Sequence, residues 1–133
     1  MMHHDRSRFV EANGMRLHLV DHGGPGVPLL LFHGLSGNAH LFDGLVAAGL
    51  GSAVRVLALD LRGRGLSDKP DRGYGVAEHA ADAVAILDAL GLERVALGGH
   101  SFGGLLALYL GASAAQRVEK LVIMDTAISF HPD

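Results

Sequence analysis

The feature that most constrains the fold is a series of short, continuously apolar runs, each followed by a loop that contains glycine or charged residues. The runs are Pro28–Phe32, Val54–Leu59, Arg94–Leu97 and Val118–Met124. Apolar runs of this length, without polar alternation, are typical of parallel strands that are covered on both faces. Helical patterns lie between them, so the sequence predicts strands joined by helical crossovers, which is the pattern of an α/β domain.

The clearest helical pattern is Val76–Leu90, in which apolar residues recur at three- and four-residue spacing. Glu78 and Asp82 lie in its first half, where the helix dipole favours anions. Gly91 follows the last apolar position and can end the helix in a left-handed conformation. We therefore expect an amphipathic helix that packs one face on the sheet.

Two further segments have helical character. Asn38 can cap a helix that reaches about Leu50. Phe102–Ala115 is apolar nearly all round, which predicts a buried helix.

The chain opens with a hairpin signal, because Asn13-Gly14 separates Phe9–Ala12 from Met15–Asp21. His18 and His22 lie on the second run, and we interpret them as exposed strand histidines. The prediction is one α/β domain over residues 1–133. It has a mostly parallel sheet of about six strands, an antiparallel amino-terminal hairpin and helices on both faces.

Composition narrows the classes of function. The chain has 133 residues, 49% of them apolar, so it can form a hydrophobic core. Its net charge of −3 does not favour binding to the phosphates of nucleic acid. It has no cysteine, no secretory signal and no apolar run long enough for a membrane span, which predicts a cytoplasmic protein with no membrane partner. His3 and His4 are interpreted as solvated residues, and no metal site is predicted.

The chemistry of the chain is concentrated where a predicted strand meets the apolar helix. Gly99 and Gly103 flank Ser101 at two residues on either side. This is the context of a nucleophile elbow, a turn so sharp that only glycine fits beside the serine. A phosphate-binding loop would need lysine at Gly104, and a dinucleotide fingerprint would need glycine at His100 or Ser101.

A serine that attacks a carbonyl creates an oxyanion, which backbone N–H groups must stabilise. The N–H of Phe102 begins the helix after the serine, and the N–H of Leu35 lies in the loop after His33 and Gly34. We expect His33 to support that loop by hydrogen bonds rather than to transfer protons.

These segments resemble the α/β-hydrolase family over residues 9–125. The His33-Gly34 loop, the Asp60–Ser67 segment and the Gly99–Gly104 elbow stand in the family's order and at its spacing. The resemblance implies an enzyme without a cofactor that acts on a small-molecule substrate, such as an ester or a related acyl or carbon–carbon compound. Serine instead of aspartate at position 101 argues against the dehalogenase and epoxide-hydrolase branches.

The same resemblance implies roles for individual residues. Ser101 is the nucleophile, Phe102 and Leu35 are the oxyanion donors, and the Asp60–Ser67 loop is structural. The family places its acid and its histidine after the nucleophile. Asp125 ends the last predicted strand and is a possible acid.

His131 follows on a terminal tail and is not expected to be the base. The resemblance therefore implies the amino-terminal part of an α/β-hydrolase core, in which the lid, the last strands and the carboxyl-terminal part are absent. We expect the 133-residue chain to be inactive alone, and to self-associate or bind a complementary carboxyl-terminal fragment through Val118–Met124. The alternative is a non-catalytic module that uses the scaffold for binding or assembly.

Overall fold

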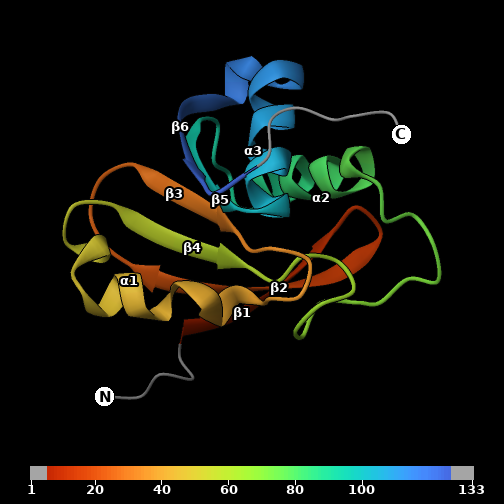
Figure 1. Cartoon of the computed structure of the whole chain (residues 1–133), viewed down its shortest axis with the longest axis horizontal. Coiled ribbons are helices and arrows are strands. Elements are labelled where there is room, and N and C mark those ends of the chain that lie inside the picture. Colours follow the sequence, from red (N-terminus) through yellow and green to blue (C-terminus); the bar gives the residue numbers. More distant parts are fainter. Residues whose placement is uncertain (1–5, 127–133) are drawn as a thin grey trace.

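The apolar runs form one six-stranded sheet in the computed structural model, which describes residues 6–126 (Figure 1). The strands lie in the order β1-β2-β4-β3-β5-β6. Their bounds are β1 (Ser7–Ala12), β2 (Met15–Gly23), β3 (Pro28–Phe32), β4 (Arg55–Leu59), β5 (Val95–His100) and β6 (Val118–Met124). The predicted α/β class is confirmed, and β3 and β6 have the predicted bounds.

The amino-terminal hairpin forms as predicted. Asn13 and Gly14 both have positive φ, 54° and 73°, which is the conformation of a tight hairpin turn whose twist matches that of the strands. β1 pairs with β2 antiparallel, and β2 pairs with β4 antiparallel. All other neighbours are parallel.

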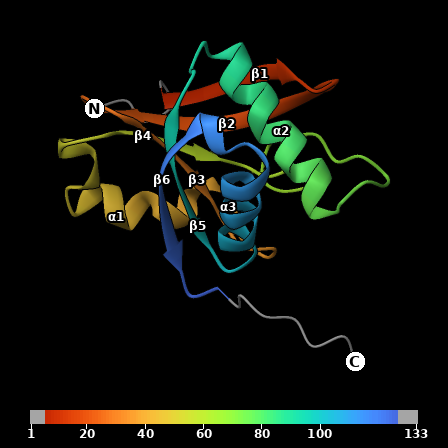
Figure 2. The ribbon, with the colours of Figure 1, turned by 90° about the horizontal axis from the view of Figure 1, so that it is seen from above.

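Helical segments cover both faces of the sheet. The α-helices are α1 (Asp43–Ala47), α2 (Val76–Ala89) and α3 (Phe102–Ser113). Figure 2 shows α1 on one side of the sheet and α2 and α3 on the other. Within residues 6–126, no helix has the length and apolar character that a bilayer crossing requires.

The two faces have separate cores. On the α2 and α3 face, buried side chains include Leu30, Phe32 and Leu57 from the sheet, together with Ile86 and Leu106 from the helices. On the α1 face, a smaller core gathers around Phe42 and Val56. This two-layer burial explains why β3 and β4 are apolar at successive positions.

The α1 region differs from the prediction of one helix from Asn38 to about Leu50. The side chain of Asn38 does cap the segment, by accepting a hydrogen bond from the N–H of His40. The chain then forms a 3₁₀ turn, the five-residue α1 and a second 3₁₀ turn. Gly49, with φ 112°, interrupts the helix because this left-handed conformation cannot continue it.

α3 is also less buried than predicted. Leu106, Ala107 and Leu110 are buried, but Tyr109 on the same helix is 38% exposed. The apolar residues around α3 therefore face solvent on one side in the part of the protein that the structure describes.

The connections place three loops at one edge of the sheet. β3 lies between β4 and β5, so the chain leaves β3 toward one side and later returns to pair on its other side. Ligands in open α/β sheets bind where the strand order reverses in this way, at the carboxyl ends of the strands. His33, Asp60 and Ser101 follow β3, β4 and β5 at that edge.

We expect the 133-residue chain to self-associate through β6, or to bind a complementary carboxyl-terminal fragment there. Among residues 6–126, β6 pairs with β5 alone, and Leu121 and Val122 are 39% and 47% exposed. Open apolar strand edges pair with other strands. Light scattering at micromolar concentration should show species larger than a monomer.

A charge on this edge should oppose pairing. Val122→Lys should therefore shift the distribution toward monomer, whereas Leu45→Lys, at an equally exposed position on α1, should leave it unchanged. A wild-type monomer with slow amide exchange along 121–124 would show that another segment protects β6.

Candidate active site

Ser101 occupies the turn between β5 and α3, and its backbone is strained. It has φ 56° and ψ −119°, a conformation that non-glycine residues adopt rarely and that clusters at functional sites. Its N–H donates to the carbonyl of Met124 at 3.1 Å, and its carbonyl accepts from the N–H of Gly104 at 2.9 Å. The residue is exposed, so the hydroxyl stands at the apex of a fixed turn.

The two flanking glycines allow close backbone contacts. A methyl group at Gly99 would overlap the backbone of Gly103 and Gly104 inside the turn. A methyl group at Gly103 would overlap the carbonyl groups of Phe32 and His33 at the end of β3. These approaches press the start of α3 against the end of β3, which brings the loop after β3 next to the serine.

Two backbone amides lie beside Ser101. Phe102 is the first residue of α3, where no intrahelical carbonyl is available to its N–H. The loop after β3 lies against the serine, because a Cβ at Gly34 would be 3.3 Å from the Cβ of Ser101. The next N–H in that loop belongs to Leu35 and donates to no residue within 6–126.

His33 fixes the peptide that carries the Leu35 N–H. Its Nε2 accepts from the N–H of Leu61 at 3.0 Å, so its Nδ1 carries the proton and donates to the carbonyl of Gly34 at 2.6 Å. Burial lowers the pKa of His33, which leaves the ring neutral at pH 7. Both ring nitrogens are therefore committed to backbone groups.

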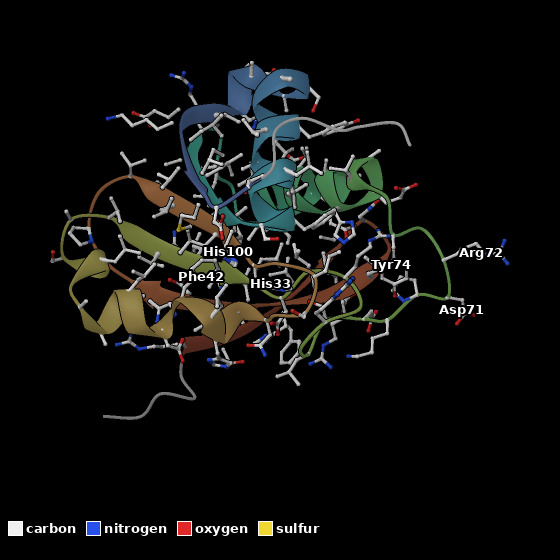
Figure 3. The ribbon with its side chains drawn as sticks, in the orientation of Figure 1. His33, Phe42, Asp71, Arg72, Tyr74 and His100 are labelled. Carbon is white, nitrogen blue, oxygen red and sulfur yellow. The ribbon has the colours of Figure 1, made fainter. Side chains whose placement is uncertain are left out.

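The same loop has two further supports. The N–H of Gly37 donates to the carbonyl of Gly34 at 3.0 Å, and Nε of Arg64 donates to the carbonyl of Leu35 at 3.0 Å. Figure 3 labels His33 together with His100, whose Nδ1 would lie 3.7 Å from a Cβ at Gly34. The loops after β3, β4 and β5 thus meet at one place.

The loop after β4 is held by a buried ion pair that no local sequence pattern reveals. Nε and Nη2 of Arg62 donate to the two carboxylate oxygens of Asp82 in α2, both at 2.7 Å. The amide of Asn13 donates to the same carboxylate at 2.8 Å, and Nη1 of Arg62 donates to the carbonyl of Gly73. Removing one partner of such a pair costs about 3–5 kcal/mol, because the other charge stays buried.

His18 corrects another expectation, since it is not an exposed strand histidine. Its side chain is 2% exposed, and its Nδ1 lies 2.7 Å from a carboxylate oxygen of Asp60. His22 is also largely buried, with a side chain that is 9% exposed. The residue pattern of β2 does not reveal this burial, because the partners are distant in sequence: Asp60 after β4 contacts His18, and Asp43 in α1 lies near His22.

The possible acid has no partner in the described part of the chain. Asp125 directly follows β6, at the same edge as Ser101, and has φ 52°. It is exposed, and its carboxylate makes no hydrogen bond or ion pair with another residue within 6–126. His131 lies outside the described residues. Thr126, which stands in no recognisable motif, donates from its hydroxyl to the carbonyl of Ser101 at 2.9 Å.

The fold and this edge define an α/β protein whose serine stands on a strained strand-to-helix turn beside two available amides. The sequence profile of the alpha/beta hydrolase fold matches residues 27–133. The chain belongs to the α/β-hydrolase fold family.

Known members of this family differ in their chemistry. The chain is 41% identical to the N-formylmaleamate deformylase of Pseudomonas putida over 121 residues, which are 90% of this chain and 45% of the relative. It is 36% identical to a soluble epoxide hydrolase of a Corynebacterium species, over 85% of this chain and 39% of the relative. The solved meta-cleavage product hydrolase of Pseudomonas fluorescens superposes with a TM-score of 0.85 at 30% identity, over 94% of this chain and 47% of that one.

The chain spans less than half the length of these relatives. The similarity therefore establishes a hydrolase family, while the individual substrates named for the relatives remain theirs.

Gly103→Ala should destabilise the protein by about 1–3 kcal/mol, because the added methyl would overlap the carbonyl of Phe32. Urea unfolding followed by circular dichroism measures this change. Gly44→Ala is the matched control, since a Cβ at that position in α1 meets open space and alanine favours helix. Equal unfolding free energies for Gly103→Ala and the wild type would contradict the close packing at the turn.

Proposed function

We propose that the chain supplies the nucleophile and the oxyanion donors of a serine hydrolase that acts on an ester or a related acyl or carbon–carbon substrate. The observation that carries the proposal is the strained backbone of Ser101 on a turn between β5 and α3. Strain of about 1–3 kcal/mol persists where the surrounding structure enforces it, and here it exposes one hydroxyl.

In the proposed reaction, Oγ of Ser101 attacks the substrate carbonyl and its proton passes to a general base. The developing oxyanion accepts hydrogen bonds from the N–H groups of Phe102 and Leu35. Each preorganised donor of this kind contributes about 3–4 kcal/mol to transition-state stabilisation. The glycines at positions 99 and 103 keep the serine in place.

The hydrogen bonds that hold the Leu35 peptide support its role as a donor. Its own peptide carbonyl, that of Gly34, accepts from both His33 and Gly37. These bonds fix the peptide plane and polarise it, which strengthens the N–H as a donor. Because both nitrogens of His33 are used in this support, we assign it a positioning role and no proton transfer.

The proposed reaction also requires a general base and an acid that orients it. Asp125 lies at the correct edge of the sheet to orient an imidazole, and we propose it as the acid. Without a base within hydrogen-bond reach, a serine hydroxyl is a poor nucleophile. The sequence has one histidine after Ser101, at position 131.

We expect a fluorophosphonate probe to label Ser101 in any preparation with hydrolase activity, since phosphonylation places an oxygen where the oxyanion donors point. Peptide mapping by mass spectrometry locates the label. Ser101→Ala should abolish the activity, whereas Ser36→Ala, an exposed serine in the loop after β3, should leave labelling at position 101 unchanged. Activity that persists in Ser101→Ala would contradict the assignment.

The 133-residue chain on its own should show no Ser101-dependent turnover of p-nitrophenyl acetate, because no histidine within 6–126 faces the Ser101 hydroxyl as a hydrogen-bond partner. The release rate of p-nitrophenol in the wild type and in Ser101→Ala should be the same. A rate that falls in both Ser101→Ala and His131→Ala would overturn this expectation and would identify His131 as the base.

A further inference from the structure

A second set of serine, histidine and aspartate side chains lies away from Ser101, in the part of the sheet formed by β1, β2 and β4. The hydroxyl of Ser7 in β1 is hydrogen-bonded to Nε2 of His18 in β2. Nδ1 of the same ring lies 2.7 Å from Oδ2 of Asp60, directly after β4. The cluster involves β1, β2 and the end of β4, and β3 lies between it and β5, which Ser101 follows.

The hydrogen bonds of Asp60 decide which nitrogen of His18 carries the proton. Its Oδ1 accepts from the N–H of Ala39 at 2.7 Å, and its Oδ2 accepts from the N–H of Leu66 at 2.9 Å. Burial alone would raise the pKa of Asp60, but these bonds and the His18 ring hold it below its usual value. An ionised carboxylate only accepts, so Nδ1 of His18 is the donor to it.

With the Nδ1 proton directed at Asp60, the form of the ring that carries one proton presents the lone pair of Nε2 to Ser7. The Ser7 hydroxyl is then the donor in their hydrogen bond, which is the arrangement that activates a serine toward an electrophile. The arrangement is rigid, because the N–H of Asp60 donates to the carbonyl of His18 at 2.9 Å and the N–H of His18 donates to Oγ of Ser67 at 2.9 Å.

A nucleophilic serine must be accessible to its substrate, and Ser7 is the exposed member of the three. His18 and Asp60 are each 2% exposed, whereas Ser7 is exposed on the edge strand of the sheet. The ring of Phe9 lies 4.9 Å from the His18 ring, and the guanidinium of Arg16 lies 3.8 Å above the Phe9 ring. The base is thus shielded from water while the hydroxyl is accessible.

A cavity lies on the face of the sheet to which Ser7 points. Val20 is the register partner of Ser7, and both side chains therefore point to the same side of the sheet. Val20 lines a cavity of about 470 Å³, whose other walls are Arg6, His22, His40, Asp43, Val46 and Ala47. Apolar and charged or polar groups therefore both line this cavity, on the face of the sheet to which Ser7 points.

We propose that Ser7 is a second nucleophilic serine, distinct from Ser101, which reacts with activated acyl or phosphonyl compounds. With an aryl ester, Oγ of Ser7 forms a bond to the acyl carbon and its proton moves to Nε2 of His18. The bond between the acyl carbon and the aryloxy oxygen breaks, and the leaving aryloxide takes the proton from His18. The products are O-acyl-Ser7 and the free phenol, and Asp60 positions the ring throughout.

The chain contains no cysteine, which permits a direct test of the environment of Ser7. A thiol beside an imidazole has a lowered pKa and is alkylated faster. Ser7→Cys should therefore react with iodoacetamide at pH 7 at least about tenfold faster than Ser52→Cys. Ser52 is the matched control, because it is exposed but donates to the carbonyl of Gly49 instead of to a base.

The double variant Ser7→Cys, His18→Gln should lose this excess rate, with circular dichroism verifying that it is folded. If Ser7→Cys reacts no faster than Ser52→Cys, the proposal is wrong. A fluorophosphonate applied to the Ser101→Ala variant tests the serine itself. Label should appear on the peptide that contains residue 7 and should be absent in Ser7→Ala, Ser101→Ala.

Mass spectrometry resolves the two peptides, so the outcomes at positions 7 and 101 are independent. Label at Ser101 without label at Ser7 would support the proposed hydrolase site and overturn the second nucleophile. Label at Ser7 alone would support the second nucleophile and count against the assignment of Ser101.

Discussion

The carboxylate of Asp60 is the interaction on which the arrangement of this fold depends. It is buried after β4 and accepts hydrogen bonds from the segment after β3, from its own loop and from the His18 ring in β2. Three parts of the chain that are remote in sequence are thereby joined at one charge. A buried carboxylate is tolerated only when its oxygens are satisfied in this way, so the three segments cannot separate without leaving it uncompensated.

The loops at the carboxyl ends of the strands depend on the hydrogen bonds of the Asp60 carboxylate. Gly65 has φ 54°, and a Cβ there would overlap the Asp60 carboxyl, so the loop after β4 wraps tightly around the charge. From this loop the N–H of Leu61 reaches His33, and the guanidinium of Arg64 reaches Leu35. The position of the proposed oxyanion donor is therefore set by contacts from the neighbouring strand as well as by its own loop.

The sequence predicted those parts of the structure whose cause is local. The hairpin at Asn13 and the turn around Ser101 follow from residue types within a few positions, so their placement was correct. Asp82 was interpreted through the helix dipole, whereas it forms a buried pair with Arg62, twenty positions earlier. The burial of His18 likewise depends on Asp60, 42 positions away, and pattern within β2 carries no information about that contact.

The two amides beside Ser101 belong to different crossovers of the sheet. Leu35 follows β3, Phe102 follows β5, and the chain between them forms α1, β4 and α2 before the two strands can pair. Bringing together two strands that are this far apart in sequence costs conformational entropy, which contacts within the helices do not offset. The proposed reactivity of Ser101 would thus be a property of the assembled sheet, and a collapsed state with intact helices but unpaired β3 and β5 would possess the serine without the two amides beside it.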